Sequence, residues 1–149
     1  MPTYVLSKLG RLGQRLTQAS IAGQELLPPH FSVLATLGDF GPLAQHELAA
    51  RLGLHRSHLV GYVDELERRE AIRRERDPDD RRRQVVSLTP AGRALLEQLR
   101  TQIENDEESF LATLSPPERG MLMELLLRLL EHADQAREGD HGAQDPADY

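Results

Sequence analysis

Apolar side chains recur at three- and four-residue steps along much of this chain, the spacing that places them on one face of a helix. The first such stripe lies within residues 4–20 and consists of Leu6, Leu9, Leu12 and Leu16. It predicts an amphipathic helix at the start of the chain. Residues 28–29 are both proline, which suits the first turn of a second helix because the missing N–H needs no partner there. The segment "GDFGPL", at residues 38–43, is expected to end that helix.

The middle of the chain predicts two short helices followed by a hairpin. Residues 44–52 and 56–70 form the helices, and Gly53 between them is a turn residue that tolerates positive φ. The period then changes to short segments with β-branched residues, at 71–76 and 83–89, on either side of the turn sequence "DPDD". Two strands joined by this charged turn form a β-hairpin.

Two leucine-rich helices are predicted after the hairpin. Thr89 and Pro90 are good N-cap and first-turn residues, and the apolar pattern behind them extends a long helix to about Leu114. Ser115, with Glu118 three positions later, begins the last helix. Its apolar side chains include Leu122, Leu125, Leu126, Leu129 and Leu130, a wider face than one contact requires. The predicted fold class is therefore mainly α with a small β-hairpin.

Composition narrows the classes of protein that fit this pattern. Hydrophobic residues make up 39% of the 149 positions and charged residues 28%, which is ordinary for a globular domain with a core. No apolar run approaches the ~18–20 residues that cross a bilayer, and no secretory signal begins the chain, so a cytoplasmic protein without a membrane partner is expected. The absence of cysteine excludes disulfides and thiol redox sensing. No catalytic or cofactor-binding motif is present, which predicts that the protein is not an enzyme and needs no cofactor.

Charge is distributed unevenly along the chain. The formal net charge is −6, but residues 1–96 hold 14 basic and 11 acidic residues, whereas residues 97–149 hold 4 and 13. The front half can therefore meet a polyanion while the acidic back half faces away. An even spread of charge over solvated helix faces is the alternative.

The two short helices have the composition of a helix-turn-helix, although an ordinary helical hairpin would share it. Leu48, Leu52, Leu54, Leu59 and Tyr62 can form the core, with Ala49 as the small residue at the crossing. The opposite face of the second helix then shows Arg56, Ser57, His58, Val60 and Gly61. Arg56 can bind a guanine or a phosphate, and Ser57 is expected to cap the helix. His58 can donate to DNA, Val60 can meet a thymine methyl, and Gly61 allows close approach.

The hairpin carries the strongest positive charge of the chain. Eight arginines lie within residues 68–83, against five acidic residues there. A hairpin after a recognition helix is a wing, and the narrow, negative minor groove attracts arginine. The candidate wing residues are Arg74, Arg76, Asp80, Arg81, Arg82 and Arg83. Asp79 and Asp80 are expected to hold the turn and orient nearby guanidiniums. A surface ion-pair network without a partner is the alternative.

The segment from about Phe31 to Leu99 resembles the MarR family of winged helix-turn-helix transcription factors. The resemblance rests on "LAQHELAARL", "VDELERRE", "DPDDRR" and "LTPAGRALL". It implies three regions: an N-terminal dimerisation helix (1–28), a winged helix-turn-helix DNA-binding domain (29–89) and C-terminal dimerisation helices (90–138). The polar composition of residues 139–149 predicts a flexible tail.

The resemblance also implies how the protein works. It implies a homodimer on double-stranded DNA at a pseudo-palindromic operator, with the recognition helix in the major groove and Arg82 in the minor groove. Asp80 falls on the family's wing aspartate. Two departures matter: Glu70 stands where the family often has glycine, and Gly61 stands where a polar or basic residue is common.

Many similar proteins release DNA when a small phenolic or anionic aromatic ligand binds between the dimerisation helices and the DNA-binding lobe. The resemblance therefore implies a repressor with a small-molecule effector, such as an aromatic carboxylate or a phenol. Arg11 and Arg15, one turn apart and off the leucine stripe, are candidate effector ligands, together with His30 at the head of the second helix. Simple solvation of the two arginines is the alternative.

Two further possibilities follow from the residues alone. His55 and His58 lack another ligand at a suitable spacing, so no metal site is expected. The acidic, leucine-rich helices leave open a protein-interaction module that does not bind DNA.

Overall fold

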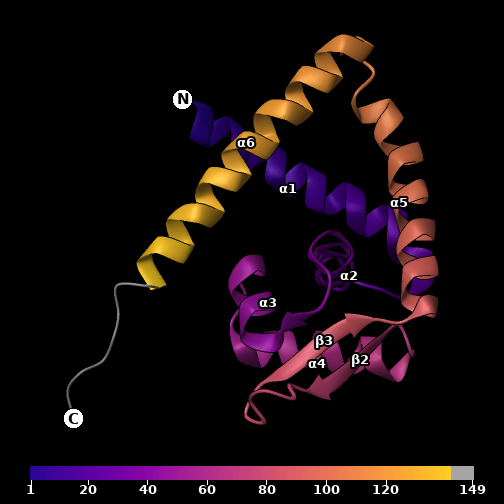
Figure 1. Cartoon of the computed structure of the whole chain (residues 1–149). Helices are drawn as coiled ribbons and strands as arrows, with labels where there is room; N and C mark the ends of the chain where they lie inside the picture. Colours follow the sequence, from indigo (N-terminus) through magenta and orange to yellow (C-terminus); the bar gives the residue numbers. More distant parts are fainter. Residues whose placement is uncertain (142–149) are drawn as a thin grey trace. The chain divides into compact units, whose positions relative to one another are not determined.

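The structure is a computed structural model that describes residues 1–141, with two compact units, Met1–Glu108 and a second that begins at Ser109. The elements, labelled in Figure 1, are α1 (Pro2–Ile21), the 3₁₀ turn η1 (Ala22–Gln24), α2 (Pro28–Phe40), β1 (Leu43–Ala44), α3 (Gln45–Leu52), α4 (Arg56–Arg68), β2 (Ile72–Arg76), β3 (Gln84–Leu88), α5 (Pro90–Phe110) and α6 (Pro116–His141). The predicted fold class, mainly α with a small β element, is confirmed. No described helix is long and apolar enough to cross a membrane.

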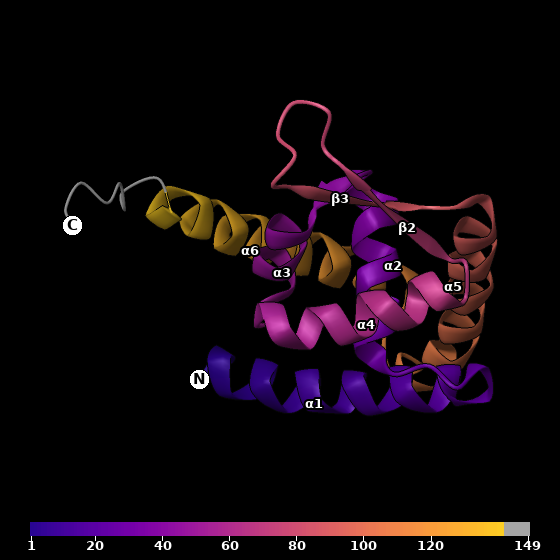
Figure 2. The same cartoon turned by 90° about the horizontal axis from the view of Figure 1, so that it is seen from below.

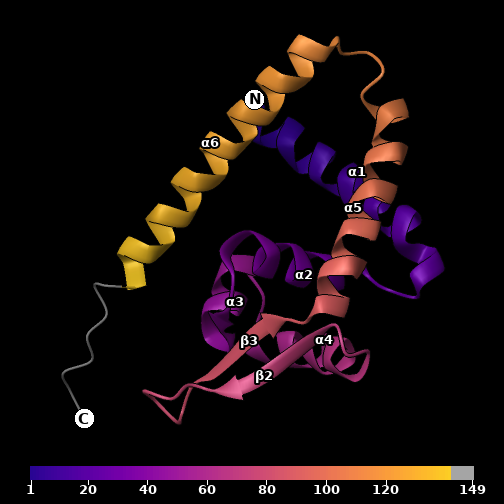
Figure 3. The same ribbon diagram turned by 45° about the vertical axis from the view of Figure 1, so that its right-hand side comes forward.

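The β-hairpin is part of a three-stranded antiparallel sheet with the order β1–β3–β2. Ile72 pairs with Leu88 and Arg76 with Gln84, so the hairpin strands are in register from base to tip. Figure 3 shows β2 and β3 side by side with α4 next to them. The sequence missed β1, because two residues are too few to show an alternating pattern. Its partner is β3, where Leu43 pairs with Val86.

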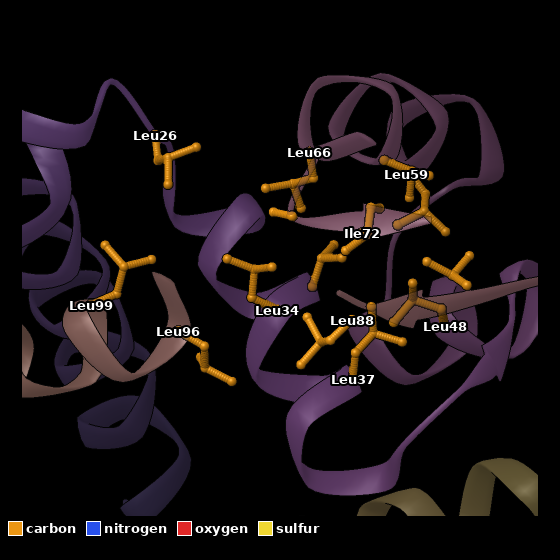
Figure 4. Close-up of a cluster of buried hydrophobic side chains, with 14 of the residues drawn as sticks. Leu26, Leu34, Leu37, Leu48, Leu59, Leu66, Ile72, Leu88, Leu96 and Leu99 are labelled. Atoms are coloured by element: carbon orange, nitrogen blue, oxygen red, sulfur yellow. The ribbon is translucent and has the colours of Figure 1, made fainter. Parts of the chain in front are cut away.

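The core of the first unit lies around α2. Leu34 is fully buried, as are Leu48 of α3, Leu59 and Leu66 of α4, and Val86 of β3. Figure 4 shows these elements, together with leucines of α5, converging on one cluster of aliphatic side chains. Burial of each such side chain contributes about 1.5–3 kcal/mol, so this shared cluster is what holds helices and sheet together.

Glycines set two close approaches to α5. The helix ends within the predicted segment 38–43: α2 continues to Phe40 and ends at Gly41, which has a φ of 78°. Gly38 makes room for α5, because a Cβ there would lie 2.6 Å from Leu96 Cδ2. At Gly92 a Cβ would lie 1.8 Å from the carbonyl oxygen of Ala71, so only glycine permits the start of α5 to pack against the hairpin base.

Helix ends follow the predicted caps more closely than the predicted lengths. Thr89 Oγ1 accepts the N–H of Gly92 at 3.0 Å, and the Ser115 N–H donates to Glu118 Oε2 at 2.8 Å, as expected for N-caps. The helix ends predicted at about residue 70 and about Leu114 lie two and four residues beyond the observed ends. α4 ends at Arg68 and α5 at Phe110, with turns of their own after them.

The C-terminal boundary differs slightly from the prediction. α6 remains helical to His141, three residues past the boundary expected at residue 138. The rest of the tail predicted over residues 139–149 lies outside the described residues.

Candidate nucleic-acid interface

α3 and α4 form the helix-turn-helix that the sequence predicts. Gly53 joins them with a φ of 62°, in the left-handed region that glycine adopts without strain. Leu48 and Leu59 are fully buried at the crossing, and Ala49 is the buried small residue beside them. The predicted inner face is thus confirmed.

The opposite face of α4 is open to solvent in its N-terminal half. All five residues predicted for DNA contact are exposed there: Arg56, Ser57, His58, Val60 and Gly61. The predicted cap is wrong, because the N-cap is His55 and Ser57 lies inside the helix. His55 Nδ1 lies 2.8 Å from Ser57 Oγ and accepts the Ser57 N–H at 3.3 Å. Imidazole takes the role expected of the hydroxyl, since an Nδ1 lone pair can serve as a cap acceptor.

The C-terminal half of α4 is acidic, and arginines neutralise it. Glu65 accepts hydrogen bonds from Arg68 and Arg69, which lower its pKa from 4.5 to about 2. Glu67 accepts from Arg74 at 2.5 Å, and this bond lowers the pKa of Glu67 as well. The acidic end of the recognition helix is therefore tied to its own protein, which leaves the N-terminal end as the cationic one.

Backbone hydrogen bonds and two aspartates shape the wing turn, drawn as the loop beyond β2 and β3 in Figure 2. The N–H of Asp77 donates to the Arg83 carbonyl at 2.9 Å, closing the loop. Asp77 Oδ1 accepts the Asp79 N–H at 2.9 Å, and Asp80 Oδ1 accepts the Arg82 N–H at 3.0 Å. The expectation that Asp79 and Asp80 orient guanidiniums is wrong. Asp77 and Asp80 hold the turn through backbone N–H groups, as short acidic side chains do in Asx turns.

The wing arginines fall into two groups. Arg74 lies between Glu67 and Asp64, and Arg83 Nη2 binds Glu47 of α3 at 2.6 Å. These two hold the hairpin to the helix-turn-helix. The other three wing arginines, Arg76, Arg81 and Arg82, are exposed and form no ion pair with another described residue. Sequence reasoning did not separate the groups, because the partner carboxylate of Arg83 lies 36 residues away in α3.

The predicted effector ligands do not all lie together. Arg11 and Arg15, with Lys8, line a hollow of about 590 Å³ whose described lining residues all belong to α1. His30 is not among them. Its ring is buried, its Nδ1 accepts the Leu27 N–H at 2.9 Å, and it packs edge-on against Tyr62. Burial is the main cause that lowers the pKa of His30 below 6.5. His30 thus caps α2 as a neutral ring.

No group of three or more potential metal ligands gathers within the described part of the chain. His55 and His58 are neighbours, with ring centroids 6.3 Å apart.

Comparison with known proteins identifies the family. The MarR family model matches residues 26–83. The chain is 31% identical over 134 residues to a putative transcriptional regulatory protein for the hcr operon of Thauera aromatica, covering 83% of this chain and 81% of that protein. It is 28% identical to the HTH-type transcriptional repressor NicR of Pseudomonas putida, over 89% of this chain and 84% of NicR.

A solved structure shows the same fold. Bordetella bronchiseptica BpsR, whose structure concerns regulation of DNA binding by 6-hydroxynicotinic acid, matches with a TM-score of 0.71 and 28% identity. The match covers 85% of this chain and 96% of BpsR.

The helix-turn-helix and the β-hairpin beside it define a winged-helix DNA-binding protein, a transcriptional regulator rather than an enzyme. Within that class, the chain belongs to the MarR family. The protein-interaction module without DNA binding is therefore not favoured.

Proposed function

We propose that this chain is a homodimeric repressor that binds a pseudo-palindromic operator and releases it when a small anionic aromatic ligand binds. The observation that carries the proposal is a set of exposed cations on α4 and the wing. Arg56 opens α4, and Arg81 and Arg82 lie at the wing turn, none of them in an ion pair with another described residue. Unpaired guanidiniums are the groups that bind phosphates and line minor grooves.

Docking follows from how these groups are distributed. The N-terminal half of α4 would enter the major groove, because acidic residues occupy its other half. The wing tip would then reach the neighbouring minor groove with Arg82. We assign Arg74 and Arg83 to holding the hairpin, and Arg76, Arg81 and Arg82 to DNA.

A second copy of the chain would cover its exposed leucines. On α1, Leu6, Leu9 and Leu12 are 39–43% exposed. On α6 the exposed apolar residues are Met121, Met123, Leu125, Leu126, Leu127, Leu129 and Leu130. Apolar surface on this scale is rarely left in water, and a symmetric dimer buries the same patch on both copies.

The effector would bind where cations face solvent on α1. Lys8, Arg11 and Arg15 give the hollow on this helix a positive lining that suits a carboxylate. NicR is named a repressor. The compound that regulates DNA binding of BpsR, 6-hydroxynicotinic acid, is an aromatic carboxylic acid. These likenesses support an aromatic carboxylate or a phenol as the ligand here. A transcriptional regulator must be in the same compartment as the DNA that it binds. The proposal therefore includes cytoplasmic localisation.

The test combines solution mass with DNA affinity. Light scattering after size exclusion should give twice the 16.8 kDa chain mass. Gel shifts with duplexes that the protein selects from a random pool should show affinity that falls roughly 10³–10⁵-fold between about 50 and 200 mM salt, as 6–10 phosphate contacts require. A monomer in solution, or binding that ignores salt, would overturn the proposal.

The effector part has its own test. A thermal-shift screen of aromatic acids and phenols should find a compound that both raises the melting temperature and displaces the selected duplex. Arg15→Ala should retain DNA affinity and lose this release. Normal release by the variant would remove Arg15 from the effector site.

A further inference from the structure

A small hollow lies between the two DNA-reading elements of the first unit. Its volume is about 280 Å³. Its polar lining consists of Gln45 and His46 at the start of α3, Arg56 at the start of α4, and Arg82, Arg83 and Gln84 from the wing and the start of β3. These residues come from three separate stretches of sequence, and only the fold brings them together.

The charge of this hollow is positive. Arg56 and Arg82 form no ion pair with another described residue. Arg83 uses Nη2 to bind Glu47 at 2.6 Å, and its buried Nε lies 4.0 Å from Asp77 Oδ2. Arg56 and Arg82 therefore supply the positive charge that is available to an added acceptor, and a guanidinium is a group that binds phosphate.

The position of the hollow indicates what that acceptor is. In the proposed docking, α4 enters the major groove and the wing enters the adjacent minor groove. One sugar–phosphate strand separates two adjacent grooves, so it must pass between the two elements. Arg56 on one side and Arg82 on the other then face that strand across the hollow.

We propose that this hollow is the seat of a single backbone phosphate of the operator, held by the guanidinium of Arg56 at the start of α4. The proposal rests on the proposed docking of α4 and the wing. It assigns Arg56 to phosphate rather than to guanine, a choice that the sequence left open. Arg83 stays assigned to holding the hairpin, because its Nη2 is bound to Glu47.

A phosphate contact and a base contact have different consequences. A phosphate is the same at every base pair, so loss of Arg56 would weaken all sequences equally. It would also lower the slope of log affinity against log salt by about 0.9 for each half-site. A guanine contact would instead weaken binding at one base-pair position.

The experiment uses the full chain and the duplex that it selects from a random pool. Each phosphate of one half-site is replaced in turn by an uncharged methylphosphonate, and affinity is measured for the wild type and Arg56→Gln. We expect Arg56→Gln to weaken the natural duplex about tenfold, as a charge-assisted bond would. At one phosphate position the substitution and the methylphosphonate should not add, because both remove the same contact.

Arg81→Gln is the matched control, since Arg81 also lies in the wing turn but does not line the hollow. The loss of affinity caused by Arg81→Gln should add to the loss caused by the methylphosphonate at that position. If Arg56→Gln is additive with every methylphosphonate, or if its loss of affinity is confined to one base pair, the proposed phosphate site is wrong. The proposed binding to an operator is not affected by that result. If the wild type selects no duplex at all, the docking itself fails and the seat fails with it.

Discussion

The guanidinium of Arg69, just past the end of α4, donates to the carbonyl of Gln24 in η1, with an Nη1–O distance of 2.7 Å. Nη2 donates to the Glu25 carbonyl at 3.0 Å, and Nε to the Glu65 carboxylate at 2.7 Å. One side chain therefore ties the exit of the recognition helix to the segment that follows α1.

Arg69→Ala should destabilise the fold, because it removes three charge-assisted bonds from a side chain that is only 26% exposed. We expect a loss of about 1.5–3 kcal/mol in the free energy of unfolding, measured by urea denaturation. Arg68→Ala is the control. Arg68 also binds Glu65, but it is 70% exposed, and its loss should cost clearly less than the loss of Arg69. Equal losses for the two variants would show that the bonds to η1 contribute nothing.

Glu70→Gly should stabilise the protein. Glu70 has a φ of 60°, and this left-handed conformation costs a non-glycine residue roughly 1–2 kcal/mol. Glycine loses more backbone entropy on folding, so the net gain should be about 0.5–1 kcal/mol. Urea denaturation measures it, with Glu104→Gly in the middle of α5 as the control that should instead lose about 1 kcal/mol. A loss of stability at both positions would show that residue 70 is not strained.

Stability should fall as the pH drops below about 6.5. The folded-state pKa of His30 is lowered from 6.5 by burial, so the unfolded chain takes up a proton that the folded chain resists. The contribution of neutral His30 is present in full above pH 6.5 and is lost as the pH falls through the lowered pKa.

His30→Asn tests this assignment, because asparagine can still accept the Leu27 N–H but does not titrate. Unfolding free energies at about pH 7.5, 6.5 and 5.5 should decline less steeply for His30→Asn than for the wild type. Parallel declines would assign the pH dependence to other groups.

Two wing arginines should give opposite phenotypes. Arg82→Ala removes an exposed cation, so it should leave the unfolding free energy unchanged within about 0.5 kcal/mol and weaken binding to the selected duplex. It should also reduce any preference for A·T pairs beside the half-sites. Gel shifts and urea denaturation on the same preparation separate the two effects.

Arg74→Ala is the counterpart, because its guanidinium bridges Glu67 and Asp64 and is only 22% exposed. It should lower the unfolding free energy by about 1–3 kcal/mol. DNA affinity should fall only as far as the hairpin loosens. If Arg74→Ala proves as stable as the wild type, the distinction between structural and DNA-facing arginines is wrong.

Periodicity identified the helices and the hairpin because it reflects which side chains are buried together. Leucine spacing located α1, α5 and α6, and Gly53 marked the turn of the helix-turn-helix. The sequence predicted the ends of the helices less accurately. α4 stops at Arg68 because the Ala71 N–H bonds the Leu66 carbonyl, a closing turn that Glu70 enters without the glycine that usually signals it.

The sequence by itself determined which residues could carry the function, since the exposed face of α4 follows from which residues of that helix are apolar. Only the tertiary structure decided which of the arginines are free. Arg83 is taken by Glu47 and Arg69 by the carbonyl of Gln24 in η1, partners 36 and 45 residues away in the chain. Local spacing fixes which side chains share a helix face, but ion pairs between distant segments exist only once the core has brought those segments together.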